Sequence, residues 1–447
     1  MHALLDDAEN RAWLHGLFFC MAICLLAACS DAEGDKRPRR VVVVVLDSTH
    51  AAHLGCYGGV DGLTPALDAL AENSRLFSQA VSNTTWTLPS TVSLMTGQLQ
   101  ETHGIVTNQH ALDEGAVLLA EQFREAGFLT AAFVQMVYAS EIYGLDQGFD
   151  EWNRYQLTVG IRPEGMAQAV ADWMDEHADD EYFLYVHMRR PHSPYDPNPL
   201  FKMHLEEGCP LADGHLDETL AHADSRVKGS LSEVERSHVE HLYRANLATV
   251  DNRIRDILRR AQQDDEALLV VTADHGEALG EHGHYGHGYS LDAECIDIPL
   301  LVAGVGVVPG IDDEPASTVD IAPTLHELCG LGRPADLDGR SLVSRLQGEV
   351  SPRRSVLLST RYNRSSIPEY GLIKDGFKVV LDREDSLKVF EMSSGEDVTG
   401  VQQELAGRVG ELLRTRKIRA STLSASEGRT PLEASTEAEL RALGYIR

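Results

Sequence analysis

Three short, largely apolar runs in this chain each lead directly into residues that carry chemistry. The runs and the polar residues that follow them are VVVVVL before Asp47, YFLYVH before His192, and ALLVVT before Asp274 and His275. Runs of this kind are typical of parallel strands that are buried on both faces. In a doubly wound α/β sheet the carboxyl ends of such strands meet at one edge, where ligands bind. The sequence therefore predicts that these distant residues converge on one cleft.

Helix-like and strand-like segments alternate through most of the chain, which predicts an α/β fold with a mainly parallel sheet flanked by helices. The expected helices are Pro65–Ala71 with Thr64 as N-cap, Val117–Ala126, Pro163–His177, Ser232–Gln263 as one helix or two, and Val319–Cys329. The further expected strands are Leu129–Val134, Ile298–Val302 and Val356–Ser359.

The character of the sequence changes near Gln347. Tyr370–Phe390 contains short strands separated by turn residues, and a helix is expected over Val401–Leu413. A chain of 447 residues also exceeds the size at which one hydrophobic core keeps growing. We therefore expect a catalytic domain over residues 41–350 and a small antiparallel α+β subdomain with a tail over residues 351–447.

The N-terminus has the pattern of an export signal. Trp13–Ala28 is almost wholly apolar and too short for a confident membrane span, and small residues lead directly into Cys29. This resembles a bacterial lipobox, which predicts a signal peptide over 1–28, lipidation of Cys29 and a polar tether over 29–40. The expected location is the cell envelope, on the periplasmic side or at the outer membrane, with the membrane as partner. A plain secretory signal is the alternative.

Charge and cysteine content narrow the possible partners. The chain carries 69 acidic and 39 basic residues, a formal net charge of −30, which argues against a nucleic-acid partner because no basic surplus exists to neutralise phosphates. Nothing in the sequence specifies an oligomeric state. The cysteines that remain after Cys29 are widely spaced, so we expect free, buried thiols at Cys56, Cys209, Cys295 and Cys329.

Thr87 lies where a helix is expected to begin. Pro89 suits the first turn of that helix, and Gly97 suits its C-terminal end. The exposed N–H groups and the positive dipole at a helix N-terminus favour an anion, whether an alkoxide on Thr87 or the oxygens of a phosphate or sulfate. An ordinary capping threonine is the alternative.

A histidine-rich stretch follows Asp274. The residues Leu279–Gly288 place three histidines, His282, His284 and His287, among glycines. Glycine lets the backbone approach a ligand closely, and imidazoles bind metals or serve as general acids. A solvated loop is the alternative, and the Asp274-His275 pair at the strand end favours the functional interpretation.

The ordered set of motifs resembles the sulfatase family of the alkaline phosphatase superfamily and covers nearly everything after the tether. The matching segments are Leu46-Asp47 with His53–Gly58, Thr64–Ala71, Pro89-Ser90 with Leu94–Gly97, Pro191–Tyr195, Thr272–Glu277, Asp338–Leu342 and Leu440–Tyr445. The resemblance implies an alkaline phosphatase/sulfatase-like fold and one bound divalent metal. It implies metal ligands at Asp47, Asp274 and His275. It also implies that His192 contacts the substrate anion, that His287 lies near the leaving group, and that Thr87 occupies the nucleophile position.

The departures from the family pattern change the expected nucleophile and metal. Sulfatases carry a cysteine, later oxidised to formylglycine, where this chain has Thr87, and an arginine where it has Thr91. The usual aspartate pair is Asp47-Ser48, and the Gly-Lys-Trp-His stretch is replaced by Phe133–Met136. The metal set of Asp47, Thr87, Asp274 and His275 is more similar to that of phosphoethanolamine and lipoteichoic-acid transferases. This set favours zinc or manganese, with calcium as the other possibility.

The threonine decides which ester we expect. A formylglycine hydrate expels sulfate by collapsing to the aldehyde, whereas a threonine ester must be cleaved by water at the central atom, as phosphoryl enzymes commonly do. We expect an exported, metal-dependent hydrolase of anionic esters with Thr87 as nucleophile and phosphate esters or diesters favoured. The alternatives are a sulfuric ester hydrolase, an envelope phosphotransferase of the phosphoethanolamine-transferase type, and an inactive binding homologue.

Overall fold

The computed structural model describes residues 37–155, 165–193, 195, 231–350, 352–360, 368–423 and 429–431, with side chains described up to residue 418. Cys29, Cys209 and the terminal segment Leu440–Tyr445 lie outside the described residues, so lipidation at Cys29 stays a prediction. Pro38–Arg447 form one unit, and the C-terminal region is a subdomain of it. Among the described residues, no helix combines the length and the apolar character needed to cross a membrane.

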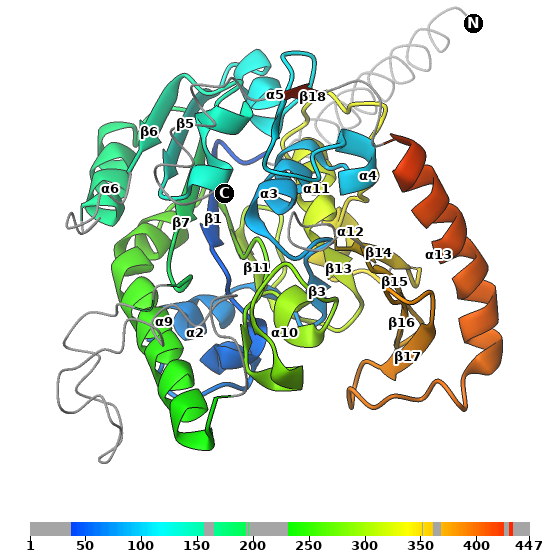
Figure 1. Cartoon of the computed structure of the whole chain (residues 1–447). Helices are drawn as coiled ribbons and strands as arrows, with labels where there is room; N and C mark the ends of the chain where they lie inside the picture. The colour runs from blue at the N-terminus through cyan, green and yellow to red at the C-terminus, as the bar shows by residue number, and fades with distance from the viewer. Residues whose placement is uncertain are drawn as a thin grey trace, which may run out of the picture. The chain divides into compact units, whose positions relative to one another are not determined.

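An eight-stranded sheet forms the centre of this unit (Figure 1). Its strands, in spatial order, are β12 (Gly310–Asp312), β2 (Arg75–Phe77), β11 (Leu300–Gly304), β8 (Ala267–Thr272), β1 (Arg40–Leu46), β7 (Tyr182–Met188), β5 (Leu129–Val134) and β6 (Glu151–Arg154). The strands from β8 to β6 are parallel, and β11 is antiparallel to both of its neighbours. The predicted mainly parallel α/β fold is confirmed.

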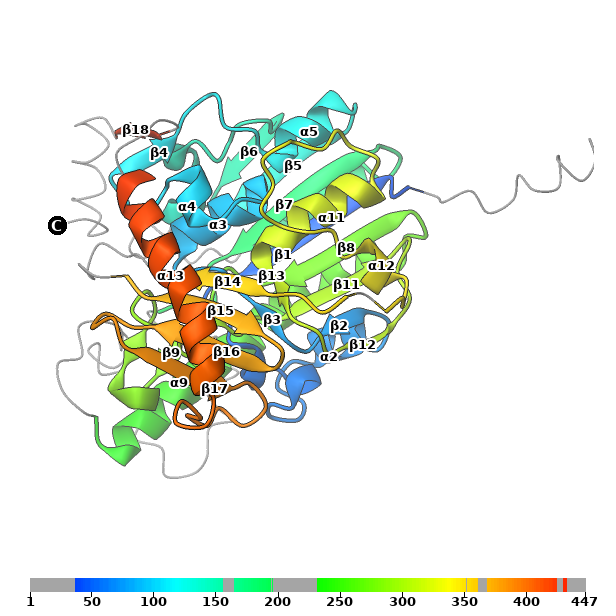
Figure 2. The same cartoon turned by 90° about the vertical axis from the view of Figure 1, so that its right-hand side faces the viewer.

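The central strand β1 shows why the sheet has two helical layers. Every residue from Arg40 to Leu46 is buried, so the strand is covered on both faces. Val41, Val43 and Val45 face one core, and the alternate residues face the other. The first core is shared with α3 (Thr87–Thr96), α5 (Leu119–Glu125) and α11 (Ile321–Leu328). The second is shared with α2 (Pro65–Ala71), α6 (Met166–Glu176) and α9 (Glu233–Gln262) (Figures 1 and 2).

The C-terminal subdomain is a separate, antiparallel sheet. It has the order β14 (Val356–Ser359), β15 (Tyr370–Lys374), β16 (Phe377–Leu381) and β17 (Leu387–Glu391). Helix α13 (Gln403–Leu423) packs on it through a small apolar core of its own (Figure 2). The predicted C-terminal antiparallel subdomain is confirmed, and its helix extends ten residues beyond the predicted end at Leu413.

Several predicted boundaries move by a few residues. The tether is predicted to end at Arg40, but Arg40 is already the first residue of β1, because it pairs in register with Tyr182 of β7 and Ala267 of β8. The segment predicted as one helix or two is the single helix α9, Glu233–Gln262, opened by a capping box between Ser232 and Glu235. Thr64 precedes α2 as predicted but makes no capping bond; its hydroxyl accepts a hydrogen bond from the Gly55 N–H instead.

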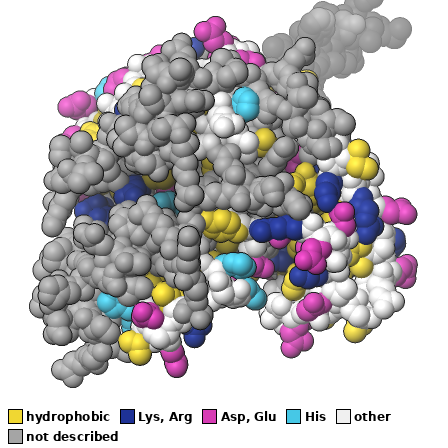
Figure 3. Space-filling model, in the orientation of Figure 1, with side chains coloured by type: hydrophobic (Ala, Val, Ile, Leu, Met, Phe, Trp, Pro, Cys, Tyr) yellow, Lys and Arg dark blue, Asp and Glu magenta, His cyan; other side chains and the backbone are white. Residues whose placement is uncertain are grey.

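The thiols and the surface charge are as composition suggests in the described part of the chain. Cys295 and Cys329 are buried free thiols, and Cys56 is a half-buried one. On the face shown in Figure 3, Lys and Arg side chains are scattered among Asp and Glu rather than gathered into one continuous basic surface.

Candidate active site

Thr87 is the first residue of helix α3, as its sequence context predicts. Trp86 is the N-cap, and Gly97 ends the helix in the left-handed region with φ of 69°. A Cβ at Gly97 would lie 2.7 Å from a terminal methyl group of Leu337, which that flexible side chain can relieve, so the positive φ is the main reason for glycine there. Thr87 is 2% exposed. Its hydroxyl therefore lies at the positive end of a buried helix, where an anion is stabilised.

The ends of β1 and β8 bring two carboxylates together. Val45 pairs with Thr272 in register, so Asp47 and Asp274 leave the sheet at the same edge. Ser48 adopts a left-handed conformation with φ of 58°, which is unusual for a residue other than glycine. In this conformation its N–H donates to Asp274 Oδ1 at 3.0 Å. Asp274 Oδ1 also accepts from the His275 N–H at 2.9 Å, so this carboxylate is fixed by two backbone donors.

Three buried atoms at this edge share an unusual property. Asp47 Oδ2, Asp274 Oδ2 and His187 Nε2 have no hydrogen-bond partner among the described residues. All three residues are at most 1% exposed, and their ligand atoms lie within 4.8 Å of one another. An unsatisfied buried polar atom costs about 1–3 kcal/mol, and more when the group is charged. Two carboxylate oxygens and one imidazole nitrogen directed at one point therefore fit a divalent cation.

His187 is a residue to which sequence reasoning assigned no role. It belongs to the buried strand β7, and its Nδ1 lies 2.9 Å from the Tyr185 hydroxyl, two residues earlier on the same face. Its position at the end of the apolar run YFLYVH predicts a strand residue, which it is, and gives no separate sign of a metal ligand. The signal that could have found it is the histidine itself, because a fully buried strand rarely ends in one without a partner.

His275 lies close to Thr87 and to both carboxylates. Its Nε2 lies 3.3 Å from Thr87 Oγ1, 3.4 Å from Asp274 Oδ2 and 3.7 Å from Asp47 Oδ1. Its Nδ1 lies 2.8 Å from the Gly276 carbonyl oxygen, which only accepts hydrogen bonds, so Nδ1 carries the proton. The lone pair of Nε2 is therefore directed at Thr87 and the carboxylates.

A row of histidines extends outward from Thr87. The ring centres of His275 and His287 are 4.3 Å apart, and those of His287 and His192 are 5.1 Å apart. His287 Nδ1 lies 3.0 Å from Glu277 Oε2, and Glu277 Oε1 accepts from the Tyr195 hydroxyl at 3.1 Å. The structure thus brings Thr87 and the three histidines together, and it adds Glu277, which carried no assigned role in the sequence.

Burial and neighbouring charges shift the pKa values of these groups. Burial lowers the pKa of His187 to about 4 and that of His192 to about 3. Burial and the neighbouring Asp274 raise the pKa of Asp47. Burial alone would raise the pKa of Glu277, but the charge and hydrogen bond of His287 hold it at about 2. The outer histidine is thus paired with a carboxylate, while the inner carboxylates repel each other in the absence of a cation.

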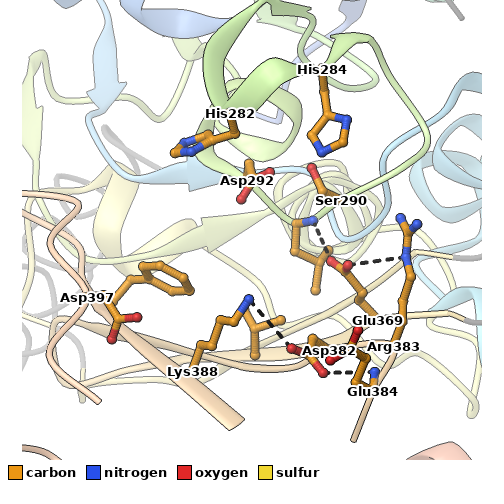
Figure 4. A pocket seen from close by; sticks show the side chains of 13 residues that line it. His282, His284, Ser290, Asp292, Glu369, Asp382, Arg383, Glu384, Lys388 and Asp397 are labelled. Atoms are coloured by element: carbon orange, nitrogen blue, oxygen red, sulfur yellow. Dashed lines mark hydrogen bonds and ion pairs between the residues drawn. The ribbon is translucent and has the colours of Figure 1, made fainter. Parts of the chain in front are cut away.

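The loop that carries His287 is held at its far end by the C-terminal subdomain. The Leu291 N–H donates to Glu369 Oε2 at 3.2 Å, and Lys378 Nζ donates to the Leu291 carbonyl oxygen at 2.7 Å. Beyond these contacts lies a cavity of about 500 Å³ between the loop and the sheet, with His282 and His284 on one wall and Lys388 on the other (Figure 4).

A model of the sulfatase family matches residues 39–331, about two thirds of the chain and all of the site described above. The chain belongs to the sulfatase family. It is accordingly an ester-bond hydrolase, and the predicted membership of the alkaline phosphatase superfamily is confirmed.

Relatives of this sulfatase-family protein are distant in sequence. It is 26% identical over 424 residues to choline-sulfatase from Rhizobium meliloti, covering 80% of this chain and 81% of that protein. It is 24% identical over 364 residues to an ulvan-active sulfatase from Formosa agariphila, covering 71% and 68%. Among solved structures, a phosphonate monoester hydrolase from Agrobacterium radiobacter gives a TM-score of 0.71 at 18% identity, covering 89% of this chain and 100% of that one. A 2-O GAG sulfatase gives 0.71 at 17% identity, covering 90% and 96%. These likenesses support the shared fold.

Proposed function

We propose that this protein is a metal-dependent ester hydrolase with Thr87 as its covalent nucleophile, and that phosphate esters or diesters are its preferred substrates. The observation that carries the proposal is the position of Thr87 Oγ1, 3.3 Å from His275 Nε2 at the N-terminus of α3. The partnerless oxygens of Asp47 and Asp274 lie at the same point.

The donor set fits one divalent metal. Asp47, Asp274 and His187 supply two oxygens and a nitrogen, and the Nε2 lone pair of His275 faces the same region. A set that mixes imidazole and carboxylate favours zinc or manganese over calcium, which prefers oxygen ligands. When bound, such an ion lowers the pKa of a nearby hydroxyl and stabilises negative charge on the group being transferred.

The side chains of the site divide the remaining work. The Thr87 hydroxyl gives its proton to the His275 Nε2 lone pair that faces it, and Oγ1 forms the new bond to phosphorus as the bond to the leaving alcohol breaks. The N–H groups that open α3 stabilise the developing charge. His287, held by the carboxylate of Glu277, is placed to give a proton to the leaving oxygen. Water then attacks phosphorus, which releases phosphate from a monoester substrate, or a phosphate monoester from a diester, and restores the Thr87 hydroxyl.

Ser90 is another buried hydroxyl on α3, and its contacts argue against a role as nucleophile. Its Oγ lies 2.5 Å from the Asp274 carbonyl oxygen, to which it donates, and 3.2 Å from Ser82 Oγ. Both contacts direct the Ser90 hydroxyl at the Asp274 backbone and at Ser82. Ser90 therefore serves to position the backbone at Asp274.

The sulfuric ester hydrolase is the second candidate, because the sequence relatives are named choline-sulfatase and ulvan-active sulfatase. The threonine favours phosphorus, since a threonine sulfate has no aldehyde to collapse to, and one structural neighbour is a phosphonate monoester hydrolase. The export and lipid anchoring predicted for Cys29 remain part of this proposal.

The test compares three esters on three proteins. Wild type, Thr87→Ala and Thr87→Ser are assayed with an aryl phosphate, an aryl phosphodiester and an aryl sulfate in the presence of zinc or manganese. Thr87→Ala should lower kcat by about 10³-fold or more at unchanged thermal stability, whereas Thr87→Ser should keep part of the activity because its hydroxyl survives.

Ser90→Ala is the comparison variant for loss of a hydroxyl on the same helix; it should lower kcat far less than Thr87→Ala, because the Ser90 hydroxyl holds the Asp274 carbonyl oxygen and forms no bond to the substrate. Full activity in Thr87→Ala would reject the nucleophile. A higher kcat/KM for the aryl sulfate than for both phosphate esters would reject the phosphate preference and support the second candidate.

A further inference from the structure

The site is rich in carboxyl groups, although its substrate is itself an anion. Asp47, Asp274 and Glu277 are each at most 1% exposed. A divalent metal offsets two negative charges, so an anionic ester still meets a site with little positive charge to receive it. Thr91, where the family resemblance predicts an arginine, is uncharged. Binding of the ester therefore requires a cation from elsewhere in the chain.

Arg189 reaches the row of histidines from the end of β7. Its Nη2 donates to the Ser193 carbonyl oxygen at 2.6 Å, and His192 Nδ1 contacts the same oxygen. The guanidinium and the imidazole therefore lie side by side. Because the His192 ring is 5.1 Å from that of His287, Arg189 lies at the outer end of the row that begins at Thr87.

The charge of Arg189 also acts on His192. Burial mainly lowers the pKa of His192, and the Arg189 guanidinium contributes to that lowering. The guanidinium is thus close enough to act electrostatically on the imidazole beside it.

The adjacent arginine has a different environment. Arg190 Nη1 contacts Asn246 Oδ1 on helix α9, and its side chain is thereby committed to that helix. Two neighbouring arginines of one loop thus differ in direction, one joined to His192 through Ser193 and the other joined to α9.

We propose that Arg189 is a substrate-binding residue that contacts the charged oxygens of the ester and supplies the cation that position 91 lacks. The inference rests on the proposed function in that it needs an anionic ester at Thr87. Guanidinium suits this task because its planar N–H groups match two oxygens of a phosphate or sulfate at once.

The experiment uses the full chain with Arg189→Met, Arg189→Lys and the matched control Arg190→Met. Binding of inorganic phosphate is measured by calorimetry, and kcat/KM is measured with an aryl phosphate dianion and an aryl phosphodiester monoanion. Arg189→Met should weaken phosphate binding by about tenfold or more and lower kcat/KM by about 100-fold, because a charge-assisted bidentate contact is lost. The loss should be larger for the dianion, Arg189→Lys should recover part of it, and Arg190→Met should stay within about threefold of wild type.

Unchanged phosphate binding in Arg189→Met would overturn the proposal. An equal loss for both esters would also overturn it, because it would mean that Arg189 acts only by positioning His192. If the wild type instead prefers an aryl sulfate, the phosphate preference fails alone, and inorganic sulfate and the aryl sulfate then replace the phosphate probes in the same comparison of Arg189 with Arg190.

Discussion

Two polar clusters, one at the ends of β1, β7 and β8 and one beside the C-terminal sheet, differ in how their charges are satisfied. In the first, Asp47, His187 and Asp274 are almost fully buried and direct partnerless atoms at one point. In the second, the cavity beside the C-terminal sheet, the charges pair with one another. Arg383 lies 3.4 Å from Glu369, and Lys388 lies 3.5 Å from Asp382 (Figure 4).

This difference distinguishes the buried cluster, which is built to bind a ligand, from the cavity, which is not. Exposed ion pairs contribute little and are satisfied by each other and by water, so the cavity needs no ligand to be stable. The buried cluster is unfavourable as it stands, because its carboxylates repel each other and its lone pairs have no donors. The fold tolerates that cost where a ligand removes it.

His287→Gln should give the largest effect outside the nucleophile and the metal-binding cluster. Loss of a general acid lowers kcat by about 10²–10⁴-fold for esters with poor leaving groups, and much less for nitrophenyl esters that leave without a proton. The measurement is the dependence of log kcat on leaving-group pKa in wild type and variant. An identical slope in the two proteins would contradict the role of His287.

Variants of two lysines of the C-terminal sheet should distinguish the effect of anchoring the His287 loop from any effect of the cavity. Lys378 is buried and donates to the Leu291 carbonyl oxygen, so Lys378→Met should loosen the loop of His287 and lower kcat by about tenfold with a lower melting temperature. Lys388→Met, which removes an exposed ion pair with Asp382, should change kcat by less than about twofold. Equal losses would mean that the cavity itself takes part in turnover.

Some residues of the site were predictable from the sequence and others were not. Asp47 and Asp274 were predictable because both follow buried parallel strands, and such strands end at one edge of a sheet. Thr87 was predictable because Pro89 and Gly97 mark the two ends of its helix. His187 was missed because, within an apolar run, a ligand and a core residue have the same pattern. The sequence assigns no role to Glu277, because its pairing with His287 exists only in the folded chain. The role proposed for Arg189 likewise depends on a contact with Ser193 that only the folded chain defines.

The central claim is that the partnerless atoms of Asp47, His187 and Asp274 hold a metal, and metal content tests it most directly. Full-length protein is purified without chelator, supplied with zinc and manganese, freed of unbound ions and analysed by plasma mass spectrometry beside Asp274→Ala and the distant control Asp251→Asn. Wild type and the control should each hold about one metal ion per chain, and Asp274→Ala should hold far less than one. Removal of the ion by chelation should lower the melting temperature of wild type, because the carboxylates then repel each other unopposed. Wild type without bound metal, or Asp274→Ala with as much metal as wild type, would contradict the account.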